Sequence, residues 1–301
     1  MEQSPIQTHL PSFITLAKES MTLYGQKWRP LLKIVCASYA AYAIVIIFGL
    51  LVLLLAAKAF PISIDNQFAW IATIAIALLF LSAIFILSSW FSAATIIVLR
   101  DWKENIGLHE SLRRAKPYVM PYFLISFLTA LFVFTGFLFF IIPGILLLIF
   151  FLFSDYVIFF GQERGIGALI KSKKYVRGFY WNIFILLLSL FATLIFVNSI
   201  FQLIEPLPFG KLIHSAANAA ISPLTTIYLY LIFNYLRKIK GDSLSVIKEK
   251  NDNNIFFPAL FIGIIIVAGL LIYHLPQIKK YYDLEIKKIE TQSGVQLIKT
   301  Q

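Results

Sequence analysis

The segment 122–160, YFLISFLTALFVFTGFLFFIIPGILLLIFFLFSDYVIFF, decides the fold of this chain. It holds 39 residues and one charged side chain, Asp155, and as a helix rising about 1.5 Å per residue it would be roughly 58 Å long. That length is enough for two crossings of a bilayer. Because proline lacks the amide hydrogen and glycine lacks the Cβ that sustain a helix, we expect the chain to turn back at Pro143-Gly144. The segment therefore predicts a transmembrane hairpin.

The composition of the whole chain is that of a membrane protein. Of 301 residues, 59% are hydrophobic and 14% charged, so a water-soluble fold would expose large apolar areas. The net charge of +11 comes from short clusters of Lys and Arg between apolar segments, so nucleic acid is not an expected partner. The single cysteine, Cys36, lies in an apolar segment, where we expect it to serve packing.

The apolar segments predict an all-α, polytopic bundle of transmembrane helices with six core spans and one more. The expected spans are 31–57, 68–99, the two limbs of 122–160, 180–204, 212–236 and 255–273. The expected domains are a six-span membrane domain at 1–241, a polar linker at 242–254, a seventh transmembrane helix at 255–274 and a polar tail at 275–301. The first residues lack the basic start of a cleavable signal, so insertion is expected to use the first span.

Amphipathic pieces precede the three pairs of core spans. Near the N-terminus, Phe13, Leu16 and Met21 fall on one helical face, which predicts a helix lying in the membrane interface and anchored by Trp28. Residues 112–119 match 169–176 at an offset of 57. These features predict three repeats of an interfacial helix plus a hairpin. The alternative is that basic amphipathic pieces before spans simply look alike.

The distribution of Lys and Arg predicts the orientation of the bundle. The segments 1–33, 100–119, 161–181 and 237–254 hold 4, 5, 5 and 5 of them, whereas the loops after the first, third and fifth spans hold one, none and one. The N-terminus is therefore expected in the cytoplasm. Seven spans would place the tail outside.

Three stretches resemble the glycerophosphoryl diester phosphodiesterase membrane-domain family, whose members are multi-span bacterial membrane domains. The stretches are the apolar-Pro-Gly turn at 141–145, the segment 168–172 (ALIKS) with Gly178, and the closing helix at 223–238. The resemblance covers residues 10–241 and implies a protein of the bacterial cytoplasmic (inner) membrane. The seventh span departs from the family pattern, and no phosphodiesterase domain is found in the sequence. The resemblance thus implies no catalysis and brings no site residues.

The sequence carries none of the motifs typical of an enzyme. Its four histidines are scattered, and it has no His-Glu-x-x-His motif, no nucleophile elbow and no Gly-rich phosphate loop. No catalytic residue, metal ligand or cofactor is therefore expected. An intramembrane enzyme acting on lipid headgroups is kept as a second alternative.

Polar residues inside the spans form the first candidate site. Several recur at helical spacing in the sixth span, which favours close helix packing or, alternatively, one wall of a groove for a lipid headgroup or small solute. Asp155 either pairs with a surface Lys or Arg or marks an ion path. The candidate groove residues are Asp155, Glu205, His214, Ser215, Asn218, Ser222 and Thr225.

Basic residues on the amphipathic pieces form the second candidate site. Each Lys or Arg near an anionic leaflet contributes about 1 kcal/mol, so such clusters are expected to contact anionic phospholipid headgroups. The candidate contacts are Arg113, Arg114, Lys116, Lys171, Lys173, Lys174 and Arg177. The leading hypothesis is a non-enzymatic integral membrane protein that binds lipid or acts as a scaffold in membrane lipid or envelope homeostasis. A transporter or channel for a small solute or lipid is the first alternative, and no protein partner is identified.

Overall fold

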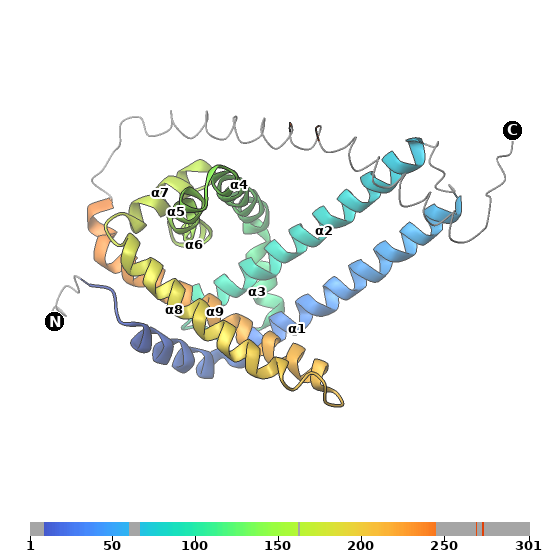
Figure 1. Cartoon of the computed structure of the whole chain (residues 1–301). Helices are drawn as coiled ribbons and strands as arrows, with labels where there is room; N and C mark the ends of the chain where they lie inside the picture. Colours follow the sequence, from blue (N-terminus) through green and yellow to red (C-terminus); the bar gives the residue numbers. More distant parts are fainter. Residues whose placement is uncertain (1–8, 60–66, 162, 245–268, 270–272, 274–301) are drawn as a thin grey trace, which may run out of the picture. The chain divides into compact units, whose positions relative to one another are not determined.

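A computed structural model describes residues 9–59, 67–161, 163–244, 269 and 273 of the chain (Figure 1). The regular structure of these residues is all helical. Its elements are α1 (Phe13–Ala59), α2 (Gln67–Arg100), α3 (Leu108–Ala115), the 3₁₀ turn η1 (Lys116–Tyr118), α4 (Val119–Phe139), α5 (Ile141–Phe151), α6 (Ser154–Gly161), α7 (Ile166–Val176), α8 (Tyr180–Gln202) and α9 (Gly210–Leu244). The seventh predicted span, the polar tail and most of the linker lie outside the described residues.

Six helices in the described part of the chain are long and apolar enough to cross a membrane. They are Phe13–Leu55, Ala75–Arg100, Leu108–Phe139, Ile141–Gly161, Tyr180–Gln202 and Gly210–Gly241. Each predicted core span overlaps one of them, so the prediction of a polytopic all-α protein with six core spans is confirmed. The prediction followed from length and hydropathy alone, because about 20 apolar residues are needed to cross the hydrocarbon core.

Helix α1 joins the predicted surface helix to the first span through a kink. Lys27, with φ −125° and ψ 19°, leaves the helical conformation three residues before Pro30. The proline has no amide hydrogen for the carbonyl of residue 26 and its ring crowds that carbonyl, which accounts for the kink. Before the kink Leu16 is completely buried whereas Met21 is 66% exposed. The predicted apolar face is therefore divided between the protein core and the surroundings.

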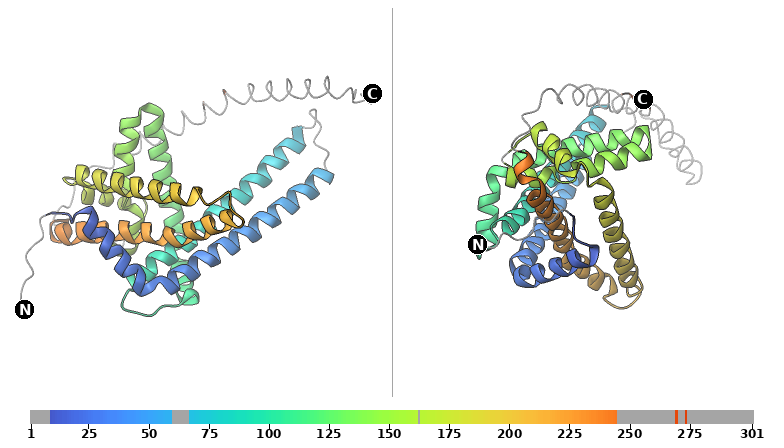
Figure 2. Two further views of the ribbon diagram at one scale, coloured as in Figure 1. Left: turned by 60° about the horizontal axis from the view of Figure 1, so that its bottom comes forward. Right: turned by 90° about the vertical axis from the view of Figure 1, so that its left-hand side faces the viewer.

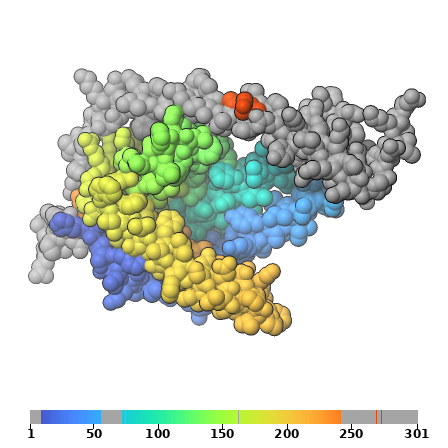
Figure 3. Space-filling view, in the orientation of Figure 1, coloured from blue at the N-terminus to red at the C-terminus, as the bar shows by residue number. Residues whose placement is uncertain are grey.

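The outer faces of the spans are as apolar as the inner ones. The surface of α8 is yellow in Figure 3. Trp181, Ile195 and Phe196 of this helix are each at least 66% exposed. In α1, Cys36 is exposed, so the expectation that it packs inside is wrong. The physical reason is that lipid is as apolar as a protein core, so hydrophobicity does not distinguish the two sides of a membrane helix.

The hairpin formed by α4 and α5 turns at Phe140, three residues before the predicted position. Pro143 is the third residue of α5, where a backbone amide has no partner within the helix, so proline is tolerated there. A Cβ on Gly144 would lie 2.5 Å from the ring of Phe137, so this position needs glycine. Residues 131–145 belong to the second of the two compact units into which the chain divides. The predicted hairpin is confirmed, and Pro143-Gly144 belongs to its second limb instead of its turn.

The second limb of the hairpin is interrupted between α5 and α6, although residues 145–160 contain neither proline nor glycine. The Ser172 hydroxyl, from α7, donates a hydrogen bond to the Phe150 carbonyl at 2.7 Å, and it accepts one from the Phe153 amide at 3.2 Å. Ser172 is completely buried. Because an unpaired backbone group in the membrane interior costs several kcal/mol, this hydroxyl permits the interruption.

Helix α9 packs against more of the other helices than α3 or α8 does. It contacts α1, α2, α7 and α8, and α1 and α2 lie side by side (Figures 1 and 2). The Phe233 ring, almost fully buried on α9, lies 5.4–5.9 Å from four other rings. These rings belong to Phe153, Tyr156, Phe160 and Tyr175. The cluster holds α6, α7 and α9 together.

We predict that Ser172→Ala lowers the free energy of unfolding by about 1–3 kcal/mol, because it leaves the Phe150 carbonyl and the Phe153 amide without this partner. Unfolding of the purified protein in mixed detergent micelles measures the loss. Ser189→Ala is the matched control, since that hydroxyl bonds only the Ile185 carbonyl of its own helix. Equal losses in the two variants would contradict the role given to Ser172.

Candidate functional site

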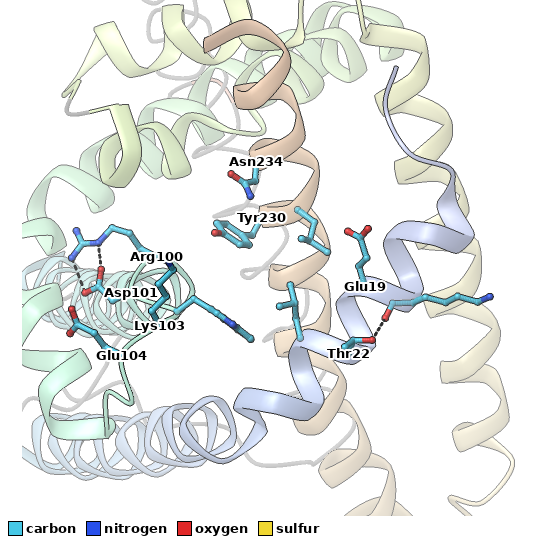
Figure 4. A pocket seen from close by; sticks show the side chains of 12 residues that line it. Glu19, Thr22, Arg100, Asp101, Lys103, Glu104, Tyr230 and Asn234 are labelled. Atoms are coloured by element: carbon cyan, nitrogen blue, oxygen red, sulfur yellow. Dashed lines mark hydrogen bonds and ion pairs between the residues drawn. The ribbon is translucent and has the colours of Figure 1, made fainter. Parts of the chain in front are cut away.

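Two cavities follow the same three helices, α1, α2 and α9. The first, which we call the charged cavity, has a volume of about 780 Å³ and lies where α2 ends. Figure 4 shows Arg100, Asp101 and Glu104 on one side, Glu19 and Thr22 of α1 on the other, and Tyr230 and Asn234 of α9 between them. Its charged lining residues are Lys18, Glu19, Arg100, Asp101, Lys103 and Glu104.

Arg114 of α3 organises one side of the charged cavity. Its guanidinium lies 2.8 Å from Asp101 and 2.6 Å from Glu104, and it also pairs with Glu110 at 2.7 Å. The side chain thus ties α3 to the connection that follows α2. Because three carboxylates already surround Arg114, it is poorly suited to contact an anionic lipid, which was the role expected from the sequence.

Asp101 is held ionised by its neighbours. Arg100 donates to it at 2.7 Å, and this hydrogen bond, reinforced by one from Arg114, holds the pKa of the Asp101 carboxyl below its usual value of 3.8 against the opposing effect of burial. Arg100 also donates to the Tyr118 hydroxyl at 3.2 Å. The acidic residues on this side are therefore compensated by the arginines beside them.

Two cations of the charged cavity, Lys18 and Lys103, form no ion pair with any described residue. Glu19 follows Lys18 on α1. Its carboxylate accepts hydrogen bonds from the Tyr235 hydroxyl at 2.8 and 3.0 Å. The cavity is lined by three cations and three carboxylates, but its two lysines are not paired with those carboxylates. An anionic group from outside the protein can therefore bind them.

The second cavity, which we call the Asp155 cavity, has a volume of about 480 Å³ and lies between α1, α2, α4, α6 and α9. Asp155 accepts a hydrogen bond from the Ser126 hydroxyl at 3.0 Å, and the Tyr122 hydroxyl interacts with the same carboxylate. Within the part of the chain that the structure describes, Asp155 has no ion pair. The pairing with a surface Lys or Arg, one of the two roles considered for Asp155, is therefore not formed.

The predicted polar groove divides into two separate groups. Ser222 lines the Asp155 cavity together with Asp155. At the other end of α9, His214 contacts Glu205 and Asn198 at 2.6 Å each, and Asn218 donates to Asn198 at 3.4 Å. Ser215 is exposed and Thr225 is half-buried, and neither lines the two cavities.

Asn198 was missed by the sequence analysis because it lies on α8, the helix before the predicted stripe. An amide side chain in an apolar span is a signal for an interhelical hydrogen bond, but the sequence does not identify its partner. The group it forms with Glu205 and His214 connects α8 to α9 near their shared loop. This arrangement supports helix packing, which was the first interpretation of the stripe.

The remaining basic candidates make mixed contacts. Arg113 pairs with Glu110 at 2.9 Å, and Lys171 lies 3.7 Å from Glu163. The amino group of Lys173 lies 6.0 Å from the centre of the Phe150 ring. Backbone carbonyls of Lys174 and Arg177 accept hydrogen bonds from the Lys240 amino group. Lys116 and Arg177 have exposed side chains, so the surface helices still present positive charge.

Comparison of the chain with protein-family models, curated proteins and solved structures finds no match. The family resemblance drawn from the sequence therefore stays a prediction. Among the described residues, no group of three or more His, Cys, Asp and Glu side chains is placed to hold a metal ion. The function must be argued from the two cavities themselves.

The depressed pKa of Asp101 predicts a pH-dependent contribution to stability. A carboxyl whose pKa is lower in the folded state stabilises the fold above its unfolded pKa, near 3.8, and this contribution disappears as the pH falls through the folded value. Asp101→Asn should therefore lower the thermal unfolding midpoint at pH 7, and its difference from the wild type should shrink below about pH 4. Thermal unfolding in detergent across this range measures it, and a difference that does not change with pH would contradict the interpretation.

Proposed function

We propose that the protein is a non-enzymatic membrane protein that binds the anionic headgroup of a phospholipid in the charged cavity. The observation that carries the proposal is the pair of lysines, Lys18 and Lys103, which line the cavity without an ion pair in the described residues. A phosphate group would compensate their charge and would also meet donors at Asn234 and Tyr230. The acyl chains would stay among the apolar outer faces of the spans.

The position of the charged cavity relative to the membrane supports this function. The cavity lies at the ends of spans where Lys and Arg are concentrated, and Trp102 lines it. Trp28 is partly exposed at the kink of α1, and Trp181 is exposed at the start of α8. Exposed tryptophans at the ends of spans are typical of the level of the lipid headgroups. A headgroup can therefore reach the cavity without leaving the membrane surface.

The proposal includes an architecture of three repeats, each an interfacial helix followed by a hairpin. Burial at equivalent positions supports it: Ala115 and Ser172, which are 57 residues apart, are both completely buried. The N-terminal part of α1, α3 and α7 would then be the three interfacial helices. The charge distribution favours a cytoplasmic N-terminus. The resemblance to the glycerophosphoryl diester phosphodiesterase membrane-domain family favours the bacterial inner membrane and a role in lipid or envelope homeostasis.

A transporter is the second candidate function, and the Asp155 cavity favours it. Carboxylates inside membrane spans are costly and often mark the path of an ion or solute. The two cavities lie on successive segments of α9, with Leu229 lining the second and Tyr230 the first. This succession would suit a path from the membrane surface into the bundle.

We predict that changing both Lys18 and Lys103 to Gln weakens binding of phosphatidylglycerol by about thirtyfold, since each lysine near an anionic headgroup contributes about 1 kcal/mol. Native mass spectrometry of the purified protein, titrated with this lipid, measures the change. The control changes Lys116 and Arg164 to Gln, because both are exposed and neither lines the cavity. If the control variant loses the lipid and the cavity variant keeps it, the lipid is held by the surface helices and the cavity is not its site.

A further inference from the structure

The Asp155 cavity combines a carboxylate with aromatic rings and lacks any basic lining residue. Its charged lining residue is Asp155, and none of the residues that line it is Lys, Arg or His. Five of the lining residues are aromatic: Tyr39, Tyr42, Phe91, Tyr122 and Tyr156. The hydroxyls of Ser92, Thr95 and Ser222 belong to the same lining residues. The carboxylate, the rings and the absence of basic lining residues favour a cationic occupant over an anionic one.

The electrostatics of the cavity call for a positive charge. An ionised carboxylate within a membrane span is costly unless a cation or enough hydrogen-bond donors compensate it. Asp155 has the neutral donor Ser126 at 3.0 Å and the Tyr122 hydroxyl beside it. These neutral groups lower the cost, but they leave the net charge of the site at minus one. A bound cation would cancel it.

The rings determine which kind of cation fits best. The faces of tyrosine and phenylalanine attract cations, and cages of such rings are a recurrent means of binding alkylated ammonium groups. Tyr42 and Phe91 lie edge to face with their ring centres 6.3 Å apart, so two of the aromatic walls are already packed against each other. A small inorganic ion would need a set of close oxygen ligands, whereas a volume of about 480 Å³ suits a larger organic group.

We propose that the Asp155 cavity binds a small organic ammonium ion, with Asp155 as its counter-ion and the surrounding tyrosine and phenylalanine rings as its cage. The proposal does not rest on the headgroup-binding function of the charged cavity. The two sites would recognise opposite charges, since the charged cavity offers two lysines without an ion pair among the described residues and the Asp155 cavity offers a carboxylate without one.

The ligand has a route into the cavity from the outer face of the bundle. Tyr39 lines the cavity and is 55% exposed, and Ser222 lines it and is exposed as well. The cavity therefore reaches the surface beside α1 and α9. The same ammonium chemistry is present in a free solute such as choline and in the headgroup of a phospholipid such as phosphatidylethanolamine. The experiment distinguishes these two sources.

The test uses the full chain reconstituted in nanodiscs of phosphatidylglycerol, so that no lipid supplies an ammonium group. Binding of radiolabelled choline is measured by scintillation proximity. We expect saturable binding that unlabelled choline displaces and that 3,3-dimethyl-1-butanol, its uncharged isostere, does not. Asp155→Asn should weaken binding by about tenfold or more, because it removes the buried counter-ion. Tyr42→Leu, which removes one ring of the cage, should weaken it as well.

Glu205→Gln is the matched control, since it also removes a carboxylate near the end of a span but does not line the cavity. It should leave choline affinity within about twofold of the wild type. The competition with the isostere needs no variant, so it decides the question even if Asp155→Asn does not fold. Displacement by the isostere, equal displacement by sodium ions, unchanged binding in Asp155→Asn, or no saturable binding would each overturn the proposal.

Adding phosphatidylethanolamine to the nanodiscs identifies the source of the ammonium group. Reduced choline binding would show that the lipid headgroup enters the same cavity. Unchanged binding would show that the site takes a free solute. Both results support an ammonium site, and neither depends on the lipid titration of the charged cavity.

Discussion

The fold depends on one constraint, which is that backbone groups in the membrane interior must find partners within the protein. The interruption between α5 and α6 would leave Phe150 and Phe153 with unpaired groups, and Ser172 of α7 supplies both missing hydrogen bonds. Helix α7 is thereby bonded to the second limb of the hairpin. Helix α3 is bonded to α2 in a similar way. The Trp90 indole of α2 donates a hydrogen bond to the Leu112 carbonyl of α3 at 2.9 Å. Both attachments fix amphipathic helices to the spans.

Because α3 and α7 are bonded to neighbouring helices, the positions of their charged side chains are set as well. Arg114 pairs with three carboxylates, two of which, Asp101 and Glu104, line the charged cavity, and the cavity's Lys18 and Lys103 have no ion pair among the described residues. Further along the same helices, the Asp155 cavity contains a carboxylate, hydroxyls and rings. Two cavities with different chemistry thus lie along α1, α2 and α9: one is lined by two lysines without an ion pair among the described residues, and the other by a carboxylate without one.

The sequence was sufficient for the spans and insufficient for the contacts between them. Six core spans follow from the length and hydropathy of each segment, and the amphipathic pieces at 108–115 and 166–176 are helices as expected. The position of the hairpin turn was wrong because Pro143 is acceptable in the first turn of α5. The interruption filled by Ser172 carries no local signal, since its partner comes from another helix. Lipid-facing and buried residues have similar hydrophobicity, so the exposure of Cys36 was not predictable either.

For the candidate sites too, the sequence identified individual residues but not which of them lie together. Asp155 and Ser222 were identified as polar residues in spans and do line one cavity, whereas Glu205 and His214 belong to a different group that includes Asn198. The charged cavity was not predicted, because it combines α1, α9 and the connection after α2. The most direct test of the account is to determine on which side of the membrane the charged cavity lies. Lys103→Cys and Leu207→Cys, each in a Cys36→Ser background, are treated with an impermeant maleimide in right-side-out membrane vesicles. The account predicts labelling of Leu207→Cys, and of Lys103→Cys only after permeabilisation; labelling of Lys103→Cys in sealed vesicles would contradict it.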